Sequence, residues 1–148
     1  MRSILILLAC LAAAPASAHV TIWPKESAAG MREKYEVRMP DEKPVDTVAL
    51  ELHVPAGVKL DSVEQKPGWQ SAFMRDGSGA IIGVRWSGRL EPMHFVEFGL
   101  IATNPPAASE LVWNATQLFA DGSKVEWSGV PGSKTPAPRV SLGARARD

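Results

Sequence analysis

Turn-forming residues recur along the whole chain and divide it into short stretches, and this spacing limits the possible fold more than any other feature. The 148 residues include 12 Gly and 12 Pro. Between the turns, apolar and polar residues alternate, as in 35–39 and 47–54. Alternation with a period of two favours half-buried β-strands.

Other stretches of the same kind predict further strands, at 58–63, 69–74, 81–86, 95–102, 111–119 and 125–127. The turn residues 76–79 and Asp121-Gly122 indicate two hairpins. No amphipathic pattern of ordinary helix length is present. We therefore predict an all-β chain with one immunoglobulin-like or cupredoxin-like β-sandwich domain.

Residues 1–18 have the three parts of a secretory signal peptide. Arg2 provides the positive charge, 4–11 the apolar segment, and Ala16-Ser17-Ala18 the small residues of a cleavage site. We expect cleavage after Ala18, a β-sandwich over 19–129, and an extended or disordered tail over 130–148.

Cleavage after Ala18 would make His19 the first residue of the mature protein. An N-terminal histidine offers one metal two nitrogen atoms, from its α-amine and its imidazole. Model α-amines titrate near pH ~8, so a metal displaces their proton at modest cost. Imidazole and amine nitrogens suit Cu(II), which has the highest affinity among the divalent first-row ions.

Charge and cysteine content exclude several classes of partner and site. Sixteen basic and sixteen acidic residues cancel, so the basic surface typical of nucleic-acid binding is absent. The single cysteine, Cys10, lies in the signal peptide, which excludes a zinc finger or a thiol nucleophile in the mature chain. Leu7-Leu8-Ala9-Cys10 resembles a lipoprotein site, but we favour the cut after Ala18. No later segment is long and apolar enough to predict a membrane span.

The remaining histidines have ordinary explanations. His53 alternates with the apolar Leu52 and Val54, which predicts a solvent-facing position on a strand. His94 follows Met93, and a thioether with an imidazole can bind Cu(I), but one adjacent pair is weak evidence. No established enzyme motif and no paired carboxylates are present, so we predict that the protein is not an enzyme.

Tryptophans are frequent, and most of them favour packing. Trp69, Trp86 and Trp113 lie in strand-like runs with apolar neighbours, so we expect them in the core. Trp23 follows the first residues of the mature chain. Trp127 ends a predicted strand, and from the residues alone it too favours packing.

Short motifs stand in a fixed order along the chain: His19-Val20-Thr21-Ile22, Pro24-Lys25-Glu26-Ser27, Gly30, Glu33-Lys34-Tyr35, Met39-Pro40-Asp41-Glu42-Lys43, Val54-Pro55, Pro67-Gly68-Trp69, Phe95-Val96-Glu97-Phe98, Asn104-Pro105, Trp113-Asn114-Ala115, Asp121-Gly122-Ser123 and Val125-Glu126-Trp127. Together they resemble the YcnI-like copper-binding domain family over essentially all of 19–129.

This resemblance implies a β-sandwich that binds Cu(II) through a monohistidine brace, the amine and imidazole of one N-terminal histidine. It assigns the histidine to His19, a glutamate to Glu42 and a tryptophan to Trp127. Met39 replaces the valine of the family's Val-Pro-x-Glu segment. Some relatives carry a C-terminal membrane anchor, and we see none here, so we expect a periplasmic protein.

The sequence therefore predicts an exported Cu(II)-binding protein that takes part in copper acquisition, delivery or homeostasis. Its partners would be copper ions and, beyond them, periplasmic copper chaperones or a membrane copper transporter. Two other functions stay open. One is a copper-dependent oxidative enzyme, whose brace needs a second histidine from His53 or His94. The other is a metal-free β-sandwich that mediates protein contacts.

Overall fold

The computed structural model describes residues 18–144, which form β-strands and connecting loops without a helix. The strands are β1 (Thr21–Trp23), β2 (Glu26–Ala28), β3 (Arg32–Pro40), β4 (Thr47–His53), β5 (Lys59–Val63), β6 (Gln70–Arg75), β7 (Ile81–Leu90), β8 (Phe95–Thr103), β9 (Glu110–Val112), β10 (Ala115–Phe119), β11 (Lys124–Trp127) and β12 (Arg139–Gly143).

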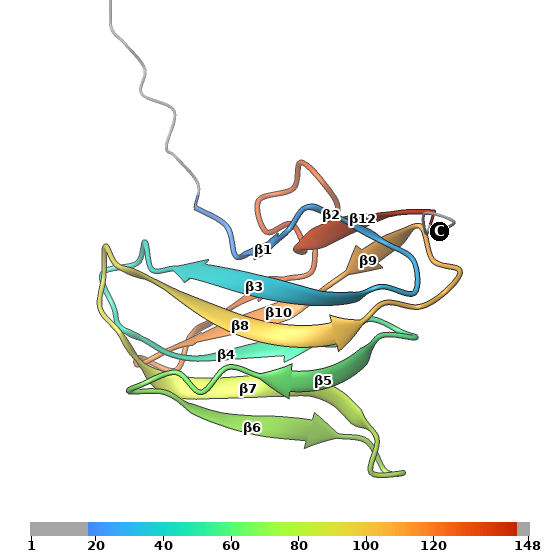
Figure 1. Cartoon of the computed structure of the whole chain (residues 1–148). Coiled ribbons are helices and arrows are strands. Elements are labelled where there is room, and N and C mark those ends of the chain that lie inside the picture. The colour runs from blue at the N-terminus through green and yellow to red at the C-terminus, as the bar shows by residue number, and fades with distance from the viewer. Residues whose placement is uncertain (1–17, 145–148) are drawn as a thin grey trace, which may run out of the picture.

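Two larger sheets form the sandwich, and a third, smaller sheet lies beside them (Figure 1). The first sheet has the order β1-β3-β8-β5 and the second β11-β10-β4-β7-β6. The small sheet has the order β2-β12-β9. The predicted all-β sandwich is therefore confirmed, as are the hairpins that join β6 to β7 and β10 to β11.

Alternation along the strands builds the core between the sheets. In β3, Tyr35, Val37 and Met39 are fully buried while their neighbours reach the surface. Trp86 of the second sheet stacks on Phe98 of the first, with ring centroids 4.6 Å apart and planes 10° apart. This aromatic pair joins the two sheets, and offset stacking of this kind contributes about 1 kcal/mol beyond burial.

The C-terminal segment differs from the sequence prediction. Residues 139–143 were expected in an extended or disordered tail, but they form β12, which pairs with β2 in parallel and with β9 in antiparallel fashion. Val140 is fully buried and Leu142 nearly so. The two apolar residues alternate with polar ones on a strand too short to stand out, and its pairing partners lie far away in the sequence.

Most of the expected packing positions agree with the structure. Trp86 and Trp113 are buried, and Trp69 packs partly buried against the core. His53 is exposed at the end of β4, on the face opposite the buried Leu52. Within residues 18–144, no helix is long and apolar enough to cross a membrane.

Candidate metal centre

The end of β3 brings the N-terminal segment and the β7–β8 loop to Glu42. Antiparallel pairing of β1 with β3 sets Thr21 opposite Arg38, so continuing this register sets His19 opposite Pro40. Pairing of β3 with β8 sets Pro40 opposite Phe95, so continuing it sets Glu42 opposite Met93. The loop after β3 therefore lies between two segments that are far apart in the sequence.

Two contacts place the predicted site residues together. The backbone N–H of Ala18 donates a hydrogen bond to Glu42 Oε1, with an N···O distance of 2.9 Å. The rings of His19 and Trp127 lie with their centroids 5.5 Å apart and their planes tilted by 52°. Ala18 thus contacts the carboxylate of Glu42, and the next residue, His19, contacts the indole of Trp127.

A buried hydrogen-bond network fixes the indole relative to the loop that carries Glu42. Trp127 Nε1 donates to Gln117 Oε1 at 3.2 Å. The amide nitrogen of Gln117 donates to the carbonyl of Pro40 at 3.0 Å and to Thr47 Oγ1 at 2.9 Å. Thr47 Oγ1 in turn donates to Asp41 Oδ2 at 2.9 Å. The network therefore links Trp127, in the second sheet, to Asp41, the residue before Glu42 in the loop that follows β3 of the first sheet.

Sequence reasoning missed Gln117. It is 2% exposed and shares the inward face of β10 with Ala115 and Phe119. A polar residue at an inward position of an alternating strand was the available signal, since buried polar groups need partners.

Replacing Gln117 by Leu is expected to lower the free energy of unfolding by about 2–4 kcal/mol. The substitution leaves the indole N–H of Trp127 and the carbonyl of Pro40 buried without this partner, and each such group costs about 1–3 kcal/mol. Urea denaturation measures the change. Gln70→Leu, at an exposed position of β6, is the control, and an equally small loss in both variants would contradict a structural role for the network.

Two cavities adjoin Glu42. One of about 180 Å³ is lined by Ala18, Glu42, Gln117 and Trp127, with Thr135 from the loop after β11. The other, of about 430 Å³, is lined by Ala18 and Glu42 together with Met93 and His94. The loop after β11 folds back on itself through a hydrogen bond from Gly129 N to the carbonyl of Thr135, which brings Thr135 beside the indole of Trp127.

The alternative candidates lie elsewhere or have other contacts. Glu26 is exposed in β2 and lines neither cavity. Glu126 forms an ion pair with Lys124 at 2.9 Å. Trp23 is 44% exposed, with the Lys25 ammonium 4.7 Å from its ring centroid. His53 faces outward, whereas His94 lines the second cavity.

Two side chains at this place could donate to a metal ion, the imidazole of His19 and the carboxylate of Glu42. Within residues 18–144, no three His, Cys, Asp or Glu side chains are grouped closely enough to hold a metal ion. Imidazole and carboxylate are both donors that Cu(II) accepts in a tetragonal arrangement.

Comparison with known sequences identifies the chain. The profile of a family described as "Domain of unknown function (DUF1775)" matches residues 19–142. The chain belongs to the DUF1775 family. The match extends into β12, which agrees with that strand being part of the fold.

This DUF1775 chain is also similar to a protein of known name. It is 38% identical over 126 residues to "Copper-binding protein CutI" of Bacillus subtilis (strain 168). The matched region covers 83% of this chain and 61% of CutI, so the chain spans less than two thirds of that relative. These matches confirm the resemblance to the YcnI-like family.

Solved structures support the fold of the DUF1775 chain. A crystal structure of an uncharacterized protein from Nocardia farcinica, described as having an immunoglobulin-like fold, matches with a TM-score of 0.75 and 25% identity over 84% of this chain and 97% of that one. The bacterial hydrophobin BslA matches with a TM-score of 0.53 and 12% identity over 88% of this chain and 98% of its own. The second likeness concerns the fold alone.

Proposed function

We propose that the mature protein binds Cu(II) with the amine and imidazole of His19 and the carboxylate of Glu42, beside the indole of Trp127. The observation that carries this proposal is that Ala18 N contacts Glu42 while the His19 ring contacts Trp127. Cleavage after Ala18 removes the nitrogen that now bonds to Glu42 and creates the amine of His19 one residue away. The name of CutI supports copper as the ion.

The roles of the three residues follow from their chemistry. Two neutral nitrogens and one carboxylate oxygen favour Cu(II) over Cu(I), because none of them is a soft sulfur ligand. The indole N–H is a donor only and is already bonded to Gln117, so Trp127 does not coordinate. It shields the ion from water and offers its π face to a cation.

A protein of this kind would act after export, in the periplasm, as a carrier in copper acquisition, delivery or homeostasis. A periplasmic copper chaperone or a membrane copper transporter would be its exchange partner. We infer no catalysis.

A copper-dependent oxidative enzyme is the second candidate, because His94 lines the cavity that adjoins Glu42. Electron paramagnetic resonance of the Cu(II)-loaded mature protein separates the two functions. One coordinated imidazole supports the carrier, two imidazoles support the enzyme, and no specific binding supports the metal-free module.

Cu(II) is expected to quench the fluorescence of Trp127 more than that of any other tryptophan. Its ring lies against that of His19, with centroids 5.5 Å apart. We therefore expect one equivalent of Cu(II) to quench the mature protein strongly and Trp127→Phe much less, with Trp23→Phe as the control. Equal quenching in native protein and Trp127→Phe would place another indole nearest the ion.

Trp127→Phe is also expected to destabilise the folded protein. Trp127 is only 8% exposed and is hydrogen-bonded to Gln117. Trp127→Phe should thus lower the free energy of unfolding by about 1–3 kcal/mol, through a lost hydrogen bond and lost volume. Binding must be compared at a temperature where both proteins are folded.

A further inference from the structure

A soft thioether and a borderline imidazole are adjacent on the loop between β7 and β8. Met93 is 95% exposed, more than any other large apolar side chain in the described part of the chain, and His94 beside it is also exposed. Within residues 18–144, Met93 is also the one non-glycine residue with a positive φ, of 65°. A left-handed backbone costs an ordinary residue about 1–2 kcal/mol.

Hydrogen bonds hold this unusual loop against the residue that precedes Glu42. Met93 N donates to the carbonyl of Asp41, and Asp41 N donates to the carbonyl of His94, both at 2.9 Å. Asp41 is itself buried and bonded to Thr47. The loop is therefore anchored to the polar network that also holds Trp127.

The left-handed residue changes where the two side chains lie. In an extended strand, neighbouring side chains point to opposite faces. A positive φ at Met93 breaks this alternation, and the residues Met93 and His94 both line the cavity that Glu42 and Ala18 also line.

The imidazole of His94 is held in one tautomer. Its Nδ1 lies 2.9 Å from the carbonyl oxygen of Pro92, and a carbonyl only accepts, so Nδ1 carries the hydrogen. The neutral ring then has its lone pair on Nε2, as in many metal-binding histidines.

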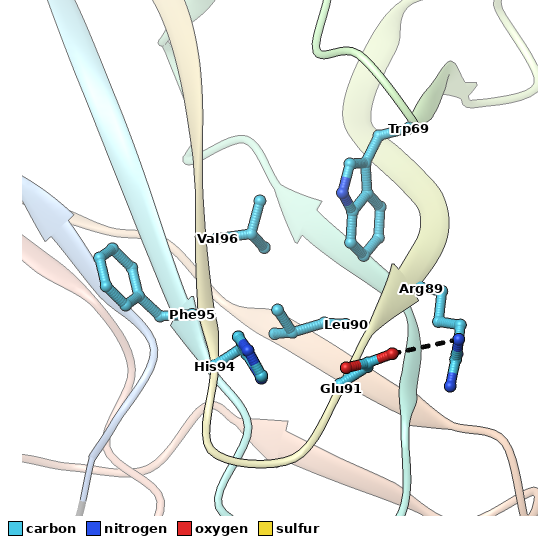
Figure 2. A pocket seen from close by; sticks show the side chains of 7 residues that line it. All are labelled: Trp69, Arg89, Leu90, Glu91, His94, Phe95 and Val96. Atoms are coloured by element: carbon cyan, nitrogen blue, oxygen red, sulfur yellow. Dashed lines mark ion pairs between the residues drawn. The ribbon is translucent and has the colours of Figure 1, made fainter.

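Glu91 carries a hard carboxylate ligand that could compete for the same ion, but this carboxylate forms an ion pair on the other side of the loop. Figure 2 shows that side, where His94 lines a further pocket, separate from the two cavities that adjoin Glu42, together with Leu90 and Glu91. The carboxylate of Glu91 is paired there with the guanidinium of Arg89 at 3.2 Å. The thioether and the imidazole are thus left as the characteristic donors of the loop.

We propose that Met93 Sδ and His94 Nε2 form a second metal subsite, which takes a soft monovalent ion of the Cu(I) class. Thioether sulfur selects Cu(I), imidazole accepts either oxidation state, and carboxylate favours harder divalent ions. The subsite goes beyond the proposed Cu(II) site and needs neither the amine of His19 nor Glu42 as a ligand. Copper could then bind to a thioether and an imidazole at the cavity beside Glu42 when it arrives at the protein or leaves it.

The test uses Ag(I), a soft ion that does not change oxidation state, with mature protein labelled at the methionine methyl groups. We expect a saturable shift of the Met93 methyl signal and of the His94 ring signals in nuclear magnetic resonance spectra. Met93→Leu and His94→Gln should each weaken Ag(I) binding by about tenfold or more. Met31→Leu, at another exposed methionine, is the matched control and should leave it unchanged.

Cu(II) binding supplies the second measurement. Unaltered Cu(II) affinity and spectrum in both loop variants, with weakened Ag(I) binding, would support the subsite. Equal Ag(I) affinity in native protein and Met93→Leu would overturn it, and so would a changed Cu(II) spectrum in His94→Gln, which would assign that imidazole to the divalent site. Loss of Cu(II) binding with Ag(I) binding retained would contradict the proposed function alone.

Discussion

Protein that retains residues 15–18 ahead of His19 is expected to bind Cu(II) about 100-fold more weakly than protein that begins at His19. The extension turns the amine of His19 into a peptide nitrogen and removes one of the proposed ligands. At about 1.4 kcal/mol for each tenfold change, the loss corresponds to about 2.8 kcal/mol. Isothermal titration against a competing chelator measures both affinities.

The length of the extension matters for this experiment. One or two extra residues would set His19 second or third in the chain, where a terminal amine and intervening peptide nitrogens can chelate Cu(II) with the imidazole. Four residues avoid those arrangements. Circular dichroism should show the same fold in both proteins, and equal affinities would contradict a site created by processing.

Glu42→Gln is expected to weaken Cu(II) binding by about ten- to 100-fold while the fold stays unchanged. The substitution keeps the shape of the side chain and removes the one anionic donor of the proposed site. Glu42 is exposed, so its replacement should change the free energy of unfolding by no more than about 0.5 kcal/mol. Affinity and the Cu(II) spectrum are the measurements.

Glu126→Gln is the matched control, because Glu126 lies beside Trp127 in the sequence but pairs with Lys124. It should bind Cu(II) like native protein. Unaltered binding in Glu42→Gln would shift the carboxylate role to Glu26 or Glu126.

The strands that could be predicted from the sequence are those with a clear alternation between strong turns. β3, β4 and the hairpin of β6 with β7 are of this kind. β1, β2 and β12 were not predicted, although strands as short as β5 and β11 were. β2 and β12 lie near opposite ends of the domain and pair with each other, so no local pattern in the sequence marks them.

Only part of the candidate site could be predicted from the sequence. His19 follows from the signal peptide and the chemistry of an N-terminal histidine. Glu42 and Trp127 are separated by most of the domain, and their assignment came from family resemblance, not from any local pattern. The structure adds Gln117 and shows that His94, already a candidate from the sequence, lines the cavity that adjoins Glu42.

The three residues of the proposed site belong to different parts of the sandwich. His19 precedes β1, at the edge of one large sheet, and Trp127 ends β11, at the edge of the other. Glu42 lies in the loop that crosses between the sheets. A bound ion would thus tie the segment that precedes β1 to the loop that follows β3, beside the indole at the end of β11. Ligand at 100 times its dissociation constant adds about 2.7 kcal/mol of stability. If copper binds at the proposed site, copper-loaded protein would resist proteolysis longer than empty protein, so the abundance of the protein would rise and fall with the copper supply.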